Sequence, residues 1–489
     1  MSHAGAVPSA SVPATDDAVT AEAVGPLRRA RAAYDRGVTR PLAWREAQLD
    51  GLARLLREGE DELVAALRAD LGKSATESWL TELSFVAGEV AALRHGLRRW
   101  ARDERVRVPF PLWPARARVR REPLGVVLVI APWNYPVQLV LAPLAAAVAA
   151  GNAVVVKPSE LAPATSRALT RLLAAHLDRD AIAVVPGGPD TGRALIEAGV
   201  DHVLFTGGAA GGRDVAVTAA RQGVPVTLEL GGKCPAIVAA DATIDVAARR
   251  ITWGKFLNAG QSCVAPDHVL VDRSREAELL DALVRATTTF FGPDPRRSPD
   301  YGRIVDDRHL ARLAALLEGP PGRIVVGGAI DPADRYVAPT VLADVDARAR
   351  VMAEEIFGPI LPVVPVDGID GAVAAVAARP DPLALYVFTG SRDLADEVVA
   401  RTRSGGVCVN DTMVHLAVPG LPFGGVGRSG TGAYHGRHGF ETFSQRRAVL
   451  ARVTRPELGL ANPPWSAPRR RLLRALLSPR AARGRGAGP

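Results

Sequence analysis

Short apolar runs alternate with segments of helical length or period along most of the chain. Each apolar run has the length expected of a buried strand. The strand candidates of the first half are 124–130, 153–156, 181–185, 202–205 and 226–230, and the helix candidates between them are 137–150, 165–176, 191–198 and 213–222. This alternation predicts βαβ units and a parallel, doubly wound sheet.

The same alternation starts again after Gly231. The strand candidates of the second half are 236–239, 268–271, 323–326, 383–388 and 406–409. A second α/β domain is the simplest interpretation, and residues 27–102, ahead of both domains, have the pattern of amphipathic helices. The most apolar run, 137–150, is too short to span a bilayer and contains Pro143, so we expect a buried helix there.

A chain of 489 residues that is 48% hydrophobic can bury a large core and is long enough for more than one domain. The three cysteines are too few for a disulfide scaffold, and no spacing resembles a zinc site, so we expect no metal. This cysteine usage fits a reducing compartment, and we expect a cytoplasmic protein. Residues 1–25 lack the basic start and compact apolar core of a signal peptide, and we predict a disordered leader there.

The net charge of +8 is concentrated near the C-terminal end of the sequence. Residues 468–489 hold seven Arg and no acidic residue, and we predict an Arg-rich, disordered tail over 456–489. The rest of the chain is near neutral, which argues against a nucleic-acid partner. Residues 469–477 are a short basic amphipathic stretch, so weak contact with a membrane surface is the alternative to a solvated tail.

The run 260–267, Gly-Gln-Ser-Cys-Val-Ala-Pro-Asp, isolates one cysteine among small and polar neighbours. It lies between a helix-like segment, 245–258, and a strand-like segment, 268–272, and a cysteine at such a junction can face a cleft. A thiolate in that position is a nucleophile. The other interpretation is that Cys263 is a small buried hydrophobic residue.

Two further residues would complete nucleophilic chemistry at Cys263. Glu229 is a carboxylate within an apolar run, where burial would raise its pKa and suit it to act as a general base. An ion pair with Lys233 is the alternative. Asn134 lies on a Pro-containing turn directly after a strand, where its amide can donate to an oxyanion, although Asn is also common in turns for conformational reasons.

Lys157 ends a strand and is followed closely by Glu160, which places a cation and a carboxylate at the carboxyl edge of the predicted sheet. Nucleotides bind at such edges. Only four of the 60 basic residues are Lys, so a Lys at this position indicates a need for a compact ammonium group. After Thr206, a glycine run that begins with Gly207 and Gly208 precedes a helix and can bring backbone N–H groups to a pyrophosphate.

Seven motifs occur in one order along the chain. They are Ala-Pro-Trp-Asn-Tyr-Pro, Lys-Pro-Ser-Glu, Phe-Thr-Gly-Gly, Leu-Glu-Leu-Gly-Gly-Lys, Gly-Gln-Ser-Cys, Glu-Glu-Ile-Phe-Gly-Pro and Pro-Phe-Gly-Gly-Val-Gly-Arg-Ser-Gly. On these motifs the chain, from residue 26 to residue 455, resembles the aldehyde dehydrogenase superfamily. The late run 432–447 is most similar to the class 3 and fatty-aldehyde branch.

The resemblance implies a division of the chain into three parts. It favours a homodimer as the assembly, and the sequence does not choose between a dimer and a tetramer. The parts are a Rossmann-like cofactor-binding domain (26–104 and 122–230), a catalytic domain (231–427) and a small β oligomerisation arm (105–121 and 428–455). The expected fold is therefore α/β, with two doubly wound domains and the arm.

The resemblance also implies that NAD or NADP is the cofactor. It assigns Lys157 and Glu160 to the adenosine ribose, and Glu355 with Phe357 to the nicotinamide ribose and ring. The adjacent Glu354 leaves a one-residue ambiguity. The sequence does not choose between NAD and NADP.

The implied reaction is the oxidation of an aldehyde to a carboxylic acid. Cys263 forms a thiohemiacetal, and Asn134 and the backbone N–H of Cys263 hold its oxyanion. Hydride transfer to the nicotinamide gives a thioester, which is hydrolysed by a water that Glu229 activates. Two alternatives stay open: a coenzyme-A-acylating aldehyde dehydrogenase, and a non-catalytic binding protein on the same scaffold.

The predicted substrate pocket is apolar. Tyr135, Leu139, Trp253 and Phe423 lie in or beside the motifs, and each of them could also be an ordinary core residue. Together they favour a medium- or long-chain aliphatic or an aromatic aldehyde over a charged one. His435, in the late run, is expected to be a packing residue rather than a proton shuttle.

Overall fold

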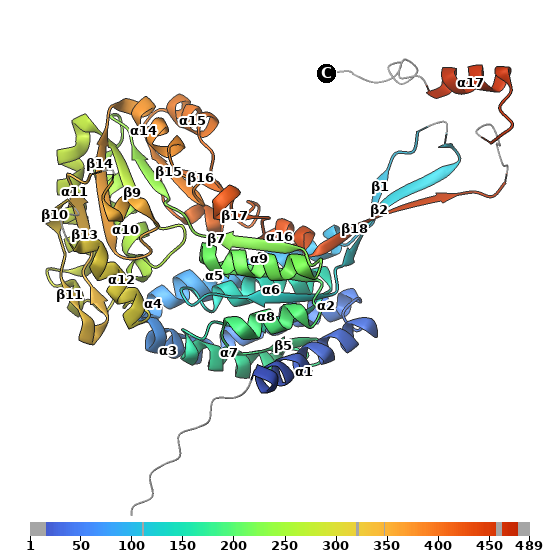
Figure 1. Cartoon of the computed structure of the whole chain (residues 1–489), viewed down its shortest axis with the longest axis horizontal. Helices are drawn as coiled ribbons and strands as arrows, with labels where there is room; N and C mark the ends of the chain where they lie inside the picture. The colour runs from blue at the N-terminus through green and yellow to red at the C-terminus, as the bar shows by residue number, and fades with distance from the viewer. Residues whose placement is uncertain (1–15, 110–111, 319–321, 347, 456–461, 478–489) are drawn as a thin grey trace, which may run out of the picture.

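The chain folds into two α/β units and a three-stranded arm that projects away from them (Figure 1). The computed structural model describes residues 16–109, 112–318, 322–346, 348–455 and 462–477. Each unit is built on its own sheet, so the predicted α/β class with two doubly wound units is confirmed.

The first unit contains a six-stranded sheet. Its strands are β3 (Val126–Ile130), β4 (Ala153–Lys157), β5 (Ile182–Val184), β6 (His202–Gly207), β7 (Val226–Leu230) and β17 (Gly430–Thr431). Their order is β17-β7-β6-β3-β4-β5, and all neighbours are parallel except β17, which runs antiparallel to β7. The strand order reverses between β3 and β6, and ligands bind at the carboxyl ends of strands at such a switch point.

Helices cover both faces of this sheet, and further helices of the first unit pack on those helices. They are α1 (Asp16–Asp35), α2 (Leu42–Glu58), α3 (Glu60–Leu71), α4 (Ala75–Ser78), the π-helical turn η1 (Trp79–Leu83), α5 (Ser84–Trp100), α6 (Gln138–Ala150), α7 (Pro163–His176), α8 (Pro189–Glu197), α9 (Ala209–Arg221) and α16 (Gly436–Thr442). Alternate residues of β3 enter different hydrophobic clusters, with Val127 and Val129 on the α6 side and Val126 and Leu128 on the α1 side.

The helix α6 is the centre of the first unit's core. Every residue of α6 is buried, and the helix packs against α2, α5 and α16 as well as against the sheet. Its sequence is apolar on all sides apart from Gln138, which is the pattern of a fully enclosed helix. The buried helix predicted over 137–150 is confirmed.

The second unit contains a seven-stranded sheet. Its strands are β8 (Pro235–Val238), β9 (His268–Asp272), β10 (Arg323–Val326), β13 (Thr340–Ala343), β14 (Ile360–Val366), β15 (Ala384–Phe388) and β16 (Gly406–Val409), and its main helices are α10 (Ile244–Phe256), α11 (Glu276–Phe291), α12 (Asp307–Leu317), α13 (Arg350–Ala353), α14 (Gly368–Ala377) and α15 (Arg392–Arg401). The order is β10-β13-β14-β9-β8-β15-β16, and only β10 and β13 are antiparallel neighbours. A short hairpin, β11 (Ile330–Asp331) and β12 (Tyr336–Val337), lies beside it.

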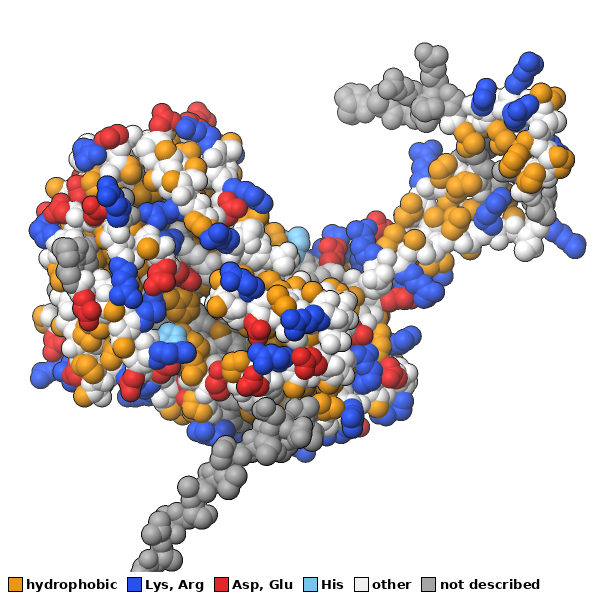
Figure 2. Space-filling view, viewed as in Figure 1, with side chains coloured by type: hydrophobic (Ala, Val, Ile, Leu, Met, Phe, Trp, Pro, Cys, Tyr) orange, Lys and Arg blue, Asp and Glu red, His pale blue; other side chains and the backbone are white. Residues whose placement is uncertain are grey.

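The arm is an antiparallel sheet with one apolar face. Its strands, in spatial order, are β1 (Glu104–Val106), β2 (Ala115–Pro123) and β18 (Ser444–Arg452). Arg alternates with small apolar residues along much of β2, so the two faces of the sheet differ in polarity. Val106, Ala117 and Leu450 lie side by side across the three strands, and Val106 and Leu450 are 45% and 54% exposed. Hydrophobic side chains are accordingly visible on the arm in Figure 2.

The predicted leader and tail are both helical in part. α1 begins at Asp16, within the segment 1–25 that was expected to be disordered, and α17 (Ala467–Leu477) lies within the tail 456–489. The expectation is corrected for these parts, because both stretches are rich in residues of good helix propensity such as Ala, Leu, Glu and Arg. The rest of the predicted leader before Asp16, and much of the tail, lie outside the described residues.

The predicted arm segment 428–455 divides between two parts of the fold. Only β18 joins the arm. β17 pairs with β7, with Gly430 opposite Glu229, and α16 packs on α5 and α6, so these elements belong to the first unit. Gly430 and Gly432 have positive φ values of 146° and 86°, which residues with a side chain rarely adopt, and these values let the chain turn along the sheet edge.

Three general features concern the described residues as a whole. Cys234, Cys263 and Cys408 are free thiols. No described helix is long and apolar enough to cross a membrane. Within the same residues there is no group of three or more His, Cys, Asp and Glu side chains that could hold a metal ion.

Candidate active site

Asn134 lies on the turn between β3 and α6, at the switch point of the first sheet. Pro132 and Pro136 restrict this turn, and Asn134 is 2% exposed. Its Nδ2 donates to the backbone oxygen of Gln261 at 3.0 Å, two residues before Cys263. Among the described residues this is the one bond that Nδ2 makes, and an amide has two N–H donors, so the second remains for a ligand.

A left-handed turn leads from α10 into the loop of the candidate nucleophile. Residues 258–260 have φ values of 53°, 50° and 74°. Gly is required at position 260, because a Cβ on Gly260 would lie 2.4 Å from the backbone of Gly358. The strain of the non-glycine residues is offset by buried hydrogen bonds, such as the one that the N–H of Asn258 donates to Glu77 Oε1 at 2.8 Å.

Cys263 follows this turn and is half-buried. Burial raises the pKa of its thiol, and the carboxylates of Glu355 and Glu229 raise it further, while the backbone N–H groups of Cys263 and Val264 act in the opposite direction. These surroundings therefore favour the thiol over the thiolate. The same contributions show that Glu229 and Glu355, from two different units, both act on this sulfur atom.

Glu229 lies on β7, between Thr206 on β6 and Gly430 on β17. It is 2% exposed, and neither carboxylate oxygen has a hydrogen-bond partner among the described residues. Burial raises the pKa of this carboxyl well above its usual range. The alternative ion pair with Lys233 is wrong, because Lys233 pairs with Asp267 instead. An unpaired buried carboxyl is costly and is the state that a general base with a raised pKa requires.

Lys157 is fixed at the carboxyl edge of the first sheet. It is 4% exposed, and its Nζ lies 3.2 Å from Glu160 Oε2 and donates to the backbone oxygen of Gly187 at 2.6 Å. Burial lowers the pKa of Lys157, and Glu160 partly offsets this. The Glu160 side chain is 43% exposed. The pair therefore presents a held ammonium group and an accessible carboxylate, which fits the hydroxyl groups of a ribose.

Thr206, Gly207 and Gly208 connect β6 to α9. The Oγ1 of Thr206 is buried without a partner, and Gly208 precedes α9 with no side chain capping the helix. A Cβ at Gly208 would meet no atom within 4 Å. The first N–H groups of the 13-residue helix are thus open, and such N–H groups bind phosphate.

Glu355, and not Glu354, faces the cysteine. Glu354 is exposed, whereas a Cβ on Gly231 would lie 2.1 Å from Glu355 Oε2, and the N–H of Gly232 donates to the Glu355 carboxylate. Burial raises the pKa of Glu355 to about 8. Of the two adjacent glutamates, Glu355 is thus the one that lies inside, near Gly231 and Cys263, and Glu354 faces solvent.

Phe357 is tied to the turn that carries Asn134. It has a φ of 48°, and its ring makes an edge contact with Trp133 at 5.4 Å between centroids. Trp133 also contacts the ring of His309 at 4.9 Å. Because Trp133 directly precedes Asn134, the loop that contains Phe357 packs against the Asn134 turn.

The four predicted pocket residues differ in solvent exposure. Tyr135 and Leu139 follow Asn134 and are 6% and 5% exposed, whereas Trp253, on α10, is half-buried. Phe423 pairs with Tyr434 in a β-bridge, and the Tyr434 hydroxyl is close enough to Glu229 and Cys263 for both to raise its pKa.

The aromatic group around Phe423 includes His435. The two rings stack with centroids 5.1 Å apart, and Phe85 contacts His435 at 5.2 Å. Burial lowers the pKa of His435 to about 3, and its ring packs among these aromatic side chains.

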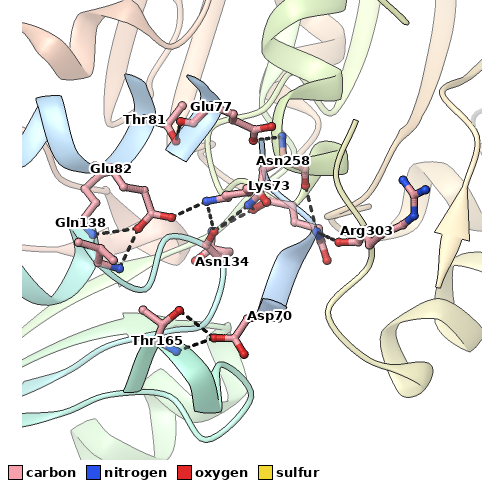
Figure 3. A network of polar contacts seen from close by, with 12 residues as sticks. Asp70, Lys73, Glu77, Thr81, Glu82, Asn134, Gln138, Thr165, Asn258 and Arg303 are labelled. Atoms are coloured by element: carbon pink, nitrogen blue, oxygen red, sulfur yellow. Dashed lines mark hydrogen bonds and ion pairs between the residues drawn. The ribbon is translucent and has the colours of Figure 1, made fainter. Parts of the chain in front are cut away.

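The sequence interpretation missed a set of buried polar residues behind the Asn134 turn (Figure 3). Lys73, Glu82, Asn258 and Gln261 lie there, and each is less than 1% exposed. The scarcity of Lys was the available signal, and it was applied only to Lys157. The same reasoning would have selected Lys73, because Arg is the default cation of this chain.

A doubly wound sheet with an uncapped helix N-terminus at its edge, and a cysteine from a second α/β unit near its switch point, are typical of a two-domain enzyme that binds a nucleotide. The profile of the aldehyde dehydrogenase family matches residues 3–449, and the chain belongs to this family.

Comparisons with individual proteins agree. The chain is 45% identical over 426 residues to "Aldehyde dehydrogenase, dimeric NADP-preferring" of Canis lupus familiaris, covering 87% of this chain and 94% of that protein. It is 46% identical over 449 residues to "Aldehyde dehydrogenase family 3 member B1" of Homo sapiens, covering 91% and 96%. The solved structure of substrate-bound Staphylococcus aureus AldH is similar, with a TM-score of 0.90, 40% identity, and coverage of 92% of this chain and 98% of that one.

These findings confirm the predicted family, its class 3 branch and the two-unit α/β fold. The protein is an NAD(P)-dependent aldehyde dehydrogenase. The coenzyme-A-acylating and non-catalytic alternatives find no support among these relatives.

Proposed function

We propose that Cys263, Asn134 and Glu229 carry out the oxidation as nucleophile, oxyanion donor and general base. One observation supports this most strongly: the Glu229 carboxyl is buried without a hydrogen-bond partner and acts electrostatically on the Cys263 thiol. The bond from Asn134 to the backbone of Gln261 holds the third residue at the same loop.

In the proposed reaction the thiol of Cys263 loses its proton to solvent, and the thiolate sulfur bonds to the aldehyde carbon. The carbonyl oxygen becomes an oxyanion, which accepts hydrogen bonds from Asn134 Nδ2 and the N–H of Cys263. Bound NAD(P)⁺ would supply the acceptor for the hydride of this carbon, and loss of that hydride leaves a thioester on Cys263. Glu229 then takes a proton from water, the hydroxide adds to the thioester, and the C–S bond breaks to release the carboxylic acid.

Two variants test this assignment. Cys263→Ala should abolish the formation of reduced cofactor, and added coenzyme A should not restore it. Asn134→Ala should lower kcat about 100–1000-fold, which is the typical cost of one oxyanion donor. If Asn134→Ala leaves kcat unchanged, Asn134 has no role in the mechanism. If turnover requires coenzyme A, the thioester is cleaved by acyl transfer to coenzyme A and not by hydrolysis.

The residues at the edge of the first sheet fit the cofactor. Lys157 and Glu160 would hold the adenosine ribose, and the N-terminus of α9 with Gly207 and Gly208 would hold the phosphates. Thr206, with its unpartnered hydroxyl, lies at the same edge, and Glu355 and Phe357 would hold the nicotinamide ribose and ring. We infer that both NAD and NADP are used, because Lys157 partly compensates the Glu160 charge that would repel a 2′-phosphate. Steady-state KM values for the two cofactors check this.

We propose a medium- or long-chain aliphatic or an aromatic aldehyde as substrate. The support is the apolar character of Tyr135, Leu139, Trp253 and Phe423 around the Asn134 turn and the aromatic group of Tyr434. A series of straight-chain aldehydes measures this directly. If kcat/KM does not rise with chain length and aromatic aldehydes are no better than acetaldehyde, the pocket assignment is wrong.

We also propose that the protein is a homodimer that associates through the arm. The supporting observation is the apolar face of β1, β2 and β18, together with the unpaired outer edges of β1 and β18 among the described residues. The canine relative is named as dimeric.

We also propose a cytoplasmic location for the protein and a membrane-surface contact for its Arg-rich tail. Free Cys234, Cys263 and Cys408 support a reducing, cytoplasmic location. The helix α17 carries four Arg beside exposed Leu472 and Leu477, which supports weak contact with an anionic membrane surface. Co-sedimentation of the full chain with phosphatidylserine vesicles, compared with a chain ending at residue 455, tests that contact.

A further inference from the structure

Lys73 is fully buried directly behind the Asn134 turn (Figure 3). Its Nζ lies 2.5 Å from Oε1 of Glu82, which is also 0% exposed. The same Nζ donates to the backbone oxygen of Asn134 at 3.0 Å and lies 4.1 Å from the ring centroid of Tyr135. The ammonium group thus joins a buried carboxylate to the backbone of the residue proposed to hold the oxyanion.

Glu82 holds the other end of the same turn. Its Oε2 accepts from the N–H of Val137 at 2.8 Å and from the N–H of Gln138 at 3.1 Å, where α6 begins. These N–H groups have no partner within the helix, and a carboxylate is a favourable acceptor at this position. The turn is therefore fixed on both sides, by Lys73 at the carbonyl of Asn134 and by Glu82 at the start of the next helix.

The second unit provides a further donor to the same carbonyl. Asn258 Nδ2 donates to the backbone oxygen of Asn134 at 2.7 Å and to that of Gln261 at 3.2 Å. Gln261 is itself held, because its Nε2 donates to the oxygen of Arg303 at 2.9 Å and its Oε1 accepts from Val305 at 3.0 Å. The carbonyl of Asn134 thus accepts two buried hydrogen bonds, one from each unit.

Stability does not explain a buried ion pair of this kind. A well-packed apolar pair of similar volume commonly stabilises a core at least as well, because both charges must leave water. Fixing a backbone does explain it, since the contribution of an oxyanion donor depends on its orientation before the reaction begins. Among the described residues, Lys73 and Glu82 contact the Asn134 turn and do not contact Cys263.

We propose that Lys73, with Glu82, is a positioning pair that holds the Asn134 amide in the orientation required by the thiohemiacetal oxyanion. This inference rests on the proposed role of Asn134. It assigns to Lys73 a role in kcat that is exerted through another residue, without contact with the substrate or the cofactor.

A double-mutant cycle tests the proposal. Lys73→Met in the otherwise unchanged enzyme should lower kcat about 10–100-fold, with KM for the aldehyde changed by less than about threefold. In the Asn134→Ala background the same Lys73→Met change should alter kcat by less than about twofold, because the group that Lys73 positions is already absent. A residue with only a structural role would lower kcat by the same factor in both backgrounds.

Two further variants control for folding. Lys73→Met leaves Glu82 without its cation, so Lys73→Met/Glu82→Gln removes the charge while an amide oxygen still accepts from the start of α6. Asp70→Asn is a matched control, because Asp70 is a buried carboxylate at the end of α3, three residues before Lys73, and accepts from the N–H of Thr165 at 2.8 Å, away from the turn. We expect the double variant to keep the low kcat and Asp70→Asn to keep the native kcat.

The outcomes are distinct. If Asn134→Ala has the native kcat, the proposed oxyanion role fails. If Asn134→Ala is slow but Lys73→Met lowers kcat equally in both backgrounds, only the positioning role of Lys73 fails. If Lys73→Met/Glu82→Gln has native kcat, or if neither Lys73 variant folds, the pair is structural and the proposal is overturned.

Discussion

Replacing Asn152 by Ala tests whether one buried side chain determines the stability of the first unit. Asn152 is 0% exposed. Its Oδ1 accepts from the N–H of Leu124 at 2.7 Å and of Gly125 at 3.0 Å, and its Nδ2 donates to the oxygens of Ala147 and Phe443, both at 2.9 Å. The side chain therefore connects the start of β3, the end of α6 and the residue that follows α16.

The expected loss follows from these four bonds. A typical intramolecular hydrogen bond contributes about 0.5–1.5 kcal/mol net, so four of them amount to about 2–6 kcal/mol. We expect Asn152→Ala to lower the free energy of unfolding by about 4 kcal/mol, the middle of that range. The kcat of the folded variant should be native, because Asn152 lies near the amino end of β3 and Asn134 follows its carboxyl end.

Urea unfolding followed by circular dichroism measures this change, with free energies compared at the midpoint of the unchanged protein. Arg285→Ala is the control, because its ion pair with Asp245 is exposed and should not shift the midpoint. A loss below about 1 kcal/mol in Asn152→Ala would refute the reasoning, since it would mean that fewer than two of the four bonds contribute.

Three further predictions concern the site and the assembly. Glu229→Gln should give a burst of reduced cofactor close to one equivalent per active site and then a steady-state rate lowered about 100–10,000-fold, and a missing burst would show that Glu229 acts before the thioester forms. Burial and two carboxylates raise the pKa of the Cys263 thiol, and only the thiolate reacts with iodoacetamide, so the labelling rate should keep increasing as the pH rises to 9. Cys263→Ser gives the background rate, and a plateau below pH 8 would contradict the prediction. In the proposed homodimer, Leu450→Glu should shift the mass measured by light scattering to that of a monomer without changing the circular dichroism spectrum, and an unchanged dimer mass would exclude the apolar arm face from the interface.

Strands and buried helices could be predicted where an apolar run had the length typical of that element. The run 226–230 was predicted as a strand and forms β7 with the same bounds, because its alternating and β-branched residues pack on both sides of a sheet. The positions of Asn134, Lys157 and Thr206 at carboxyl strand ends followed from these runs, since side chains after neighbouring parallel strands meet at one edge.

The buried polar contacts were not predictable in the same way. Lys73 and Glu82 carry no sign of burial in the sequence, because Glu and Lys are ordinary residues of exposed helices and only the tertiary packing removes these two from water. The pairing of Gly430 with Glu229 joins residues about 200 positions apart and depends on the return of the chain from the second unit to the first sheet, which no local pattern encodes.

The edge strand β17 has a consequence for how the protein is made. A ribosome completes β7 and its Glu229 long before it reaches Gly430, so β7 emerges as an open sheet edge and α6 lacks the cover of α16. A chain whose synthesis stops, or which is cleaved, ahead of Gly430 would keep Cys263, Asn134 and Glu229 but leave Glu229 on an unpaired edge strand. The pairing of β17 with β7 thus makes the enclosure of Glu229 depend on a segment that is synthesised about 200 residues later.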